Sequence, residues 1–103
     1  MDLLMIEFSV AVVHADQEGS QKLVGSTPTY ISMNKIKYFH RIDRQFAAEL
    51  CNNSGDLNPD VVTEYTVFNF GGGESVLIAE PFDDIVAKLT EANAIFNSRR
   101  FNG

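Results

Sequence analysis

The chain of 103 residues is long enough for one domain with its own hydrophobic core. Its formal net charge of −6 works against non-specific binding to nucleic acid or to anionic membranes. The single cysteine, Cys51, excludes an internal disulfide framework, and no apolar run approaches the ~20 residues that a membrane helix needs. We therefore expect one domain over residues 1–103 and a reducing, cytoplasmic location.

The first patterned stretch is Ile6–His14, which alternates apolar and polar residues as a half-buried strand does. Its inner face is predicted to hold Ile6, Phe8, Val10 and Val12. Turn formers follow at Asp16–Gln21, and Lys22–Gly25 is predicted to return as the second strand of a hairpin. We expect the segment Ser26–Pro28 to break this second strand.

A short strand is predicted next at Tyr30–Met33, closed by Asn34, and Ile36–Ile42 then alternates again. The alternation divides this later strand into two faces. The inner face is predicted to hold Ile36, Tyr38, His40 and Ile42, and the outer face Lys37, Phe39 and Arg41. Beyond it the pattern lapses, and residues 44–63 are predicted to form a long loop with at most one or two helical turns.

The best-supported prediction is a hairpin followed by a helix. Tyr65–Phe70 is β-branched and aromatic, Gly71–Gly73 supplies the positive φ angles of a tight turn, and Glu74–Ala79 returns as a strand. Beyond Pro81 an amphipathic helix is predicted, with the apolar stripe Phe82, Ile85, Val86, Leu89 and Phe96. The chain is thus expected to be α+β: an antiparallel meander of four to six strands, as a sheet or small open barrel, packed by one C-terminal helix.

Two segments of this pattern match a known arrangement of strand, turn, strand, hairpin and acidic helix entry. They read ISMNKIKYF at residues 31–39 and TVFNFGGGESVLIAEPFDDI at residues 66–85. Together they resemble the FlbD/SwrD-like family of small flagellar-associated proteins, over roughly a third to a half of the chain. The resemblance implies a small, non-catalytic accessory protein that works through contacts.

Residues capable of chemistry lack the spacing of a catalytic or binding motif. His14 and His40 have no convergent Cys, His or carboxylate partners close in the sequence, and Cys51 has no neighbouring cation to activate its thiol. Gly71–Gly73 precedes a strand, whereas a phosphate loop opens a helix. Asn52–Asp60 is rich in oxygen ligands without the spacing of a calcium loop. We therefore expect no enzymatic activity, no cofactor and no metal site.

Half of the basic residues fall within ten positions, interleaved with two aromatic residues. This segment is the candidate interaction surface, made of Lys35, Lys37, Phe39, Arg41 and Arg44. Such a stripe suits contact with nucleic-acid phosphates, with Phe39 stacking on a base. It suits equally well cross-strand pairing with Glu64 or Glu74, the usual arrangement of charges on the wet face of a sheet.

Three functions remain open. The first is a small non-enzymatic protein-interaction or assembly module, which binds a protein partner or forms a homo-oligomer through exposed sheet edges. The second is nucleic-acid binding through the basic–aromatic strand 35–44, which the acidic total disfavours. The third is a small acidic inhibitor of a host protein, of the kind found in viruses. Its support is a group of carboxylates near the predicted helix: Glu74, Glu80, Asp83, Asp84 and Glu91.

Overall fold

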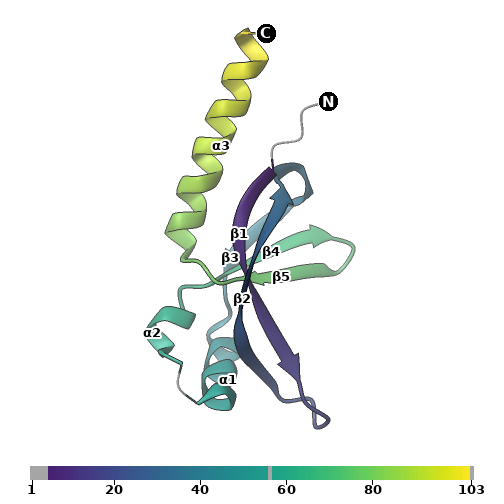
Figure 1. Cartoon of the computed structure of the whole chain (residues 1–103), viewed down its shortest axis with the longest axis vertical. Helices are drawn as coiled ribbons and strands as arrows, with labels where there is room; N and C mark the ends of the chain where they lie inside the picture. The colour runs from purple at the N-terminus through teal and green to yellow at the C-terminus, as the bar shows by residue number, and fades with distance from the viewer. Residues whose placement is uncertain (1–4, 56, 103) are drawn as a thin grey trace.

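The chain folds into one five-stranded antiparallel sheet with a long C-terminal helix, which confirms the predicted α+β class (Figure 1). The computed structural model describes residues 5–55 and 57–102, the side chains of 96–102 excepted. The elements are β1 (Met5–Ala15), β2 (Gln21–Ser32), a 3-10 turn η1 (Met33–Lys35), β3 (Tyr38–Arg41), α1 (Arg44–Ser54), α2 (Pro59–Val62), β4 (Thr66–Gly71), β5 (Glu74–Ile78) and α3 (Phe82–Asn102). The strands lie in the order β2-β1-β5-β4-β3, so β2 and β3 are the two outer edges.

Two small cores lie on opposite faces of this sheet, because successive residues of a strand point to opposite sides. We call them the α3-side core and the α1-side core. The α3-side core is centred on Phe8, Ile31, Phe68, Ile78 and Ile85. The α1-side core is centred on Ala11, Leu23, Ile42, Ala47, Leu50, Val62 and Leu77. Neighbours such as Leu77 and Ile78 on β5 therefore belong to different cores.

The predicted helix is present as α3, and its first turns cover one face of the sheet. Ile85 is fully buried and Leu89 packs beside it, as the stripe predicted, but Val86 is 39% exposed and so lies outside the stripe. Ala92 takes part instead and is buried. The predicted contribution of Phe96 lies outside the described side chains. Figure 1 shows α3 extending beyond the sheet, at the opposite end of the molecule from α1 and α2.

The prediction of a long loop over residues 44–63 is wrong, because this segment forms α1 and α2. The Asp43 carboxylate caps α1 by accepting the Gln45 N–H at 2.7 Å, and Gly55 ends the helix with a φ of 79°. Asn58 caps α2 in the same way. Leu50 is fully buried in the α1-side core. This burial stabilises α1, although the polar residues at its C-terminal end favour a turn when considered alone.

Tyr65 packs against the α1-side core, where burial and the nearby Cys51 raise the pKa of its hydroxyl above the ordinary value of 10.0. Above pH 10 the unfolded state ionises first, so stability is expected to fall until the pH passes the folded-state pKa. Urea denaturation at pH 9 and 11 measures this fall, and Tyr65→Phe should reduce it. Tyr38→Phe, at an exposed tyrosine, is the control. An equal fall in the Tyr65→Phe variant contradicts the prediction.

The second strand does not break at Ser26–Pro28 but runs on to Ser32. Both backbone groups of Ser9 face β5, since its carbonyl accepts the Ala79 N–H and its N–H is bonded to the Glu80 carboxylate. Pro28, the β2 residue that pairs with Ser9, therefore turns its nitrogen away from β1. An outer strand tolerates proline at such a position, because no ladder hydrogen bond is lost.

Candidate interaction surface

The outer side of β3 is an open sheet edge. β3 pairs with β4 through residues 38–41, and the Ile42 N–H donates to the Tyr65 carbonyl at 2.9 Å. Alternation along the strand then directs the backbone groups of Phe39 and Arg41 away from β4. The Arg41 carbonyl lies 2.7 Å from His40 Nδ1. Within the described residues, no strand pairs with the outward N–H groups of Phe39 and Arg41 or with the Phe39 carbonyl.

The predicted faces of this strand are reversed over its central residues. Phe39 packs into the α3-side core, with its ring 6.1 Å from that of Phe68 and 5.5 Å from that of Phe82. Tyr38 is 62% exposed, and His40 is exposed as well. The prediction is wrong because the alternation is interrupted before β3, where the Lys37 N–H donates to the carbonyl of Asn69, the residue that pairs with Tyr38. Ile36 packs against the α3-side core, whereas Ile42 belongs to the α1-side core.

Arg41, at the end of β3, is held by three groups from two other places in the chain. Its guanidinium donates to Glu64 Oε2 at 2.9 Å and lies 3.5 Å from Asp83 Oδ1. Its Cζ atom lies 4.7 Å from the centre of the Phe82 ring. The alternative of pairing with Glu64 is thus confirmed for this arginine. The partners at the start of α3 were missed, because Asp83 lies 42 positions along the chain and tertiary contacts, such as the Phe82 N–H to Glu64 carbonyl bond, bring it there.

The other basic residues of the candidate surface carry charge that no carboxylate of the described chain neutralises. Lys35 Nζ lies 5.2 Å from the centre of the Phe70 ring, and Lys37 lies against the backbone at Gly71. Arg44 is exposed on the first turn of α1. None of these three side chains forms an ion pair with any described residue.

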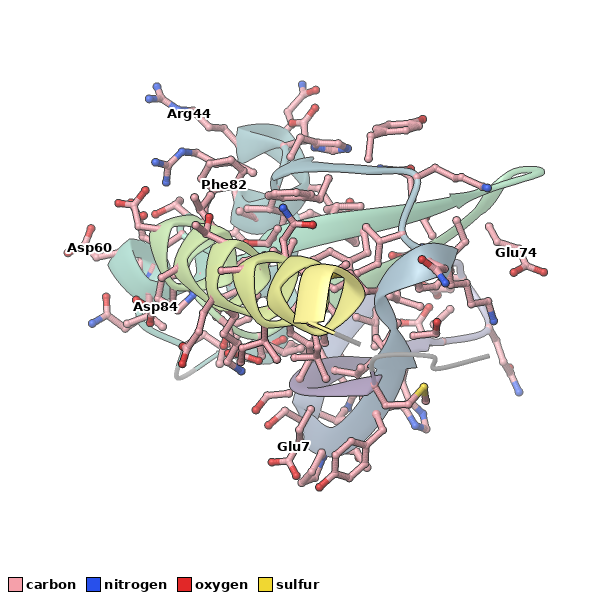
Figure 2. All side chains as sticks on the ribbon, turned by 90° about the horizontal axis from the view of Figure 1, so that it is seen from above. Glu7, Arg44, Asp60, Glu74, Phe82 and Asp84 are labelled. Atoms are coloured by element: carbon pink, nitrogen blue, oxygen red, sulfur yellow. The ribbon has the colours of Figure 1, made fainter. Side chains whose placement is uncertain are left out.

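A cleft opens where β3 ends, between the starts of α1 and α3. It has a volume of about 730 Å³, and we call it the arginine cleft. Its lining residues are Arg41, Ile42, Arg44, Thr63, Glu64 and Asp83. Figure 2 shows Arg44 and Phe82 on one side of the molecule, well separated from Glu7 and Glu74. The candidate residues thus flank an open edge with a cleft at its end, but Phe39 is half-buried against the α3-side core.

The other free edges are partly closed by the chain itself. On β2, the Leu23 N–H donates to Ser54 Oγ at 2.8 Å, Asn53 Nδ2 donates to the Gln21 carbonyl, and Pro28 lacks an N–H. The inner edge between β1 and β5 is open beyond their one described pair, Val10 with Ile78. There the strands border a shallow, mostly apolar cavity of about 330 Å³, against which the Phe46 side chain of α1 lies.

The residues considered for chemistry lie in different parts of the fold. His14 borders a cavity at the tip of the β1–β2 hairpin with Asp16, Lys22 and Asn53, while His40 lies on β3. Cys51 packs against the α1-side core from α1. No group of three or more His, Cys, Asp or Glu side chains suited to a metal ion occurs among the described residues. The segment Asn52–Asp60, which is rich in oxygen ligands, belongs largely to α1 and α2.

The chain matches no family model, no curated protein and no solved structure. The resemblance to the FlbD/SwrD-like family therefore stays a prediction. Within the described part of the chain, no helix is both long enough and apolar enough to cross a membrane.

Proposed function

We propose that this protein is a small interaction module that binds an extended segment of another protein by adding it as a strand beside β3. The observation that carries the proposal is the open outer edge of β3, where the N–H groups of Phe39 and Arg41 face away from the sheet. Backbone groups left unpaired at a sheet edge accept a further strand through main-chain hydrogen bonds.

The edge is also held in a defined position, which favours binding. Phe39 packs into the α3-side core and Ile42 into the α1-side core, so both faces of the sheet hold this segment. Arg41 adds contacts to Glu64 and Asp83. An edge that is already ordered loses little conformational entropy when a partner binds. We also propose a cytoplasmic location, which the single free cysteine favours.

Self-association through β3 is less favourable than binding of a different chain. In an antiparallel pair of two β3 strands centred on Phe39, Lys37 of one copy lies opposite Arg41 of the other, and like charges directly across a ladder destabilise it. Nucleic-acid binding has less support than protein binding, because Phe39 packs against Phe68 and Phe82 and Arg41 is already paired with carboxylates.

Selection of extended peptides tests the proposal. We expect a phage-displayed library of random peptides of about twelve residues to yield ligands that shift the NMR signals of the Phe39 and Arg41 amides. Arg41→Pro removes one outward N–H and should weaken these ligands about tenfold relative to Arg41→Ala, which keeps it. Both variants lose the same side-chain contacts, so the comparison isolates the backbone donor.

Circular dichroism establishes whether Arg41→Pro is folded. If it is not, peptides N-methylated at the residue opposite Phe39 replace it, since the methyl group removes a hydrogen bond from the peptide side. Selection of no ligand, signal shifts confined to other parts of the chain, or equal affinity for the two Arg41 variants contradicts the proposal. Sedimentation of the protein over a concentration series reports self-association, and a homo-oligomer that Arg41→Pro disrupts would show that β3 pairs with a second copy of the chain instead.

A further inference from the structure

We propose that the segment added to β3 is acidic, with side-chain carboxylates facing Lys37 and Arg44 and an apolar side chain facing Tyr38. This inference rests on the proposed function, because it names the chemistry of the partner that the β3 edge selects. The inference depends on side chains that flank β3 and on the arginine cleft at the end of the strand.

Positive charge without a partner at this edge is the first observation. Acidic residues outnumber basic ones by 14 to 8 in the whole chain, yet four of the eight basic residues lie within residues 35–44. Glu64 and Asp83 pair with Arg41, but Lys35, Lys37 and Arg44 form no ion pair in the part of the chain that is described. Basic side chains on an edge strand oppose pairing with a neutral or basic strand and favour an acidic one.

The alternation of β3 arranges the partner's side chains. Arg41 lies on the same side of the sheet as Phe39, whereas Tyr38 lies on the other side with its ring largely exposed. Lys37 precedes β3, where the alternation is interrupted, and its exposed side chain lies against the backbone at Gly71. In a strand added to β3, an apolar residue opposite Tyr38 meets its exposed ring, and carboxylates meet the basic side chains that flank the two ends of β3, Lys37 and Arg44. Opposite charges and aromatic contacts directly across a ladder both stabilise it.

Past the end of the strand, the arginine cleft adds one cation, Arg44, that forms no ion pair with a described residue. Arg44 projects there from α1 and can bind a carboxylate that follows the paired segment. The same cleft contains Glu64 and Asp83, whose carboxylates repel a ligand that carries a negative charge on every unit. This arrangement favours a peptide with separated carboxylates over a nucleic acid with a continuous phosphate backbone.

Charge reversal at matched positions tests the inference. Peptides selected on the wild-type protein are sequenced, synthesised with amidated C-termini, and measured by fluorescence anisotropy at low and physiological salt. We expect Asp and Glu to be enriched toward the two ends of the paired segment, and about tenfold weaker binding to Lys37→Glu and to Arg44→Glu. Arg44→Glu should stay folded, because a negative charge at the first residue of α1 suits the helix dipole.

Lys22→Glu is the matched control, because Lys22 is also exposed and without an ion pair but lies on β2, at the opposite edge of the sheet. Lys22→Glu should change the affinity for the selected peptides less than twofold. Affinity for the wild type should fall as salt is added, and a peptide with its acidic residue changed to lysine should bind Lys37→Glu better than the wild type. Amidation should not abolish binding, which assigns the contact to side-chain carboxylates.

Four results overturn the inference, and the first three leave the proposed function standing. The first is ligands that shift the Phe39 and Arg41 amides but contain no enriched acid. The second is equal effects of Lys37→Glu and Lys22→Glu. The third is peptides that need a free C-terminal carboxylate. An oligouridine that displaces the peptides from the wild type also overturns it, in favour of nucleic acid. Selection of no ligand at all overturns both this inference and the proposed function.

Discussion

Replacement of Phe68 by alanine is expected to lower the free energy of unfolding by about 3–5 kcal/mol. Phe68 is fully buried at the centre of the α3-side core, and its ring meets that of Phe8 edge to face with the centroids 4.9 Å apart. It also contacts Phe39, the residue that fixes β3 to this core. Because a domain of this size has a total stability of about 5–15 kcal/mol, the loss brings the variant close to unfolding.

Urea denaturation followed by circular dichroism measures this effect. Tyr38→Ala is the matched control, since it removes an aromatic ring from the neighbouring strand at an exposed position and should cost about 0.5 kcal/mol or less. A loss below about 1 kcal/mol for Phe68→Ala would show that the α3-side core is not packed as described. Weaker peptide binding by this variant would further indicate that the core holds the β3 edge in place.

Replacement of Glu80 by alanine is expected to cost about 2–3 kcal/mol. The Glu80 side chain is only 15% exposed, and its two oxygens accept from the Ser9 N–H at 2.8 Å and from Lys88 Nζ at 2.6 Å. Lys88 Nζ also donates to the Glu7 carbonyl at 3.0 Å and lies 5.0 Å from the centre of the Phe8 ring. The carboxylate thus joins β1 to α3 close to the single described residue pair between β1 and β5.

Glu80→Gln separates the contribution of the Ser9 hydrogen bond from that of the ion pair with Lys88. Its amide oxygen still accepts the Ser9 N–H, but the charge opposite Lys88 is lost. We expect it to cost less than Glu80→Ala. Glu74→Ala, at an exposed carboxylate on the β4–β5 hairpin, is the control and should have little effect on urea denaturation. If Glu80→Ala is no more destabilising than Glu74→Ala, the carboxylate does not join β1 to α3.

The candidate site shows how far sequence patterns reach. Charge and aromatic content along residues 35–44 singled out the segment that becomes the open edge, and Glu64 was among the partners expected for its cations. The same pattern placed Phe39 on the surface. Alternation states which residues share a face of a strand, but when both faces of a sheet are covered it does not state which face meets which core.

What the sequence determined by itself is the local structure of the second half of the chain. The positive φ angles at Gly71–Gly73, the two strands that flank them and the helix after Pro81 follow from backbone preferences and periodicity within a few residues. The caps at Asp43 and Gly55 are local signals too, and Arg44–Leu50 is rich in good helix formers, whereas Cys51–Ser54 has weaker helix propensity.

Only the tertiary structure decided that α1 forms, that β2 continues through Pro28, and that Arg41 meets the start of α3. Each of these depends on groups distant in sequence: burial of Leu50 against the sheet, the position of β2 at an outer edge, and the bond between the Phe82 N–H and the Glu64 carbonyl. Such contacts stabilise a segment whose local preference is ambiguous, and they come into being only when the whole sheet has assembled.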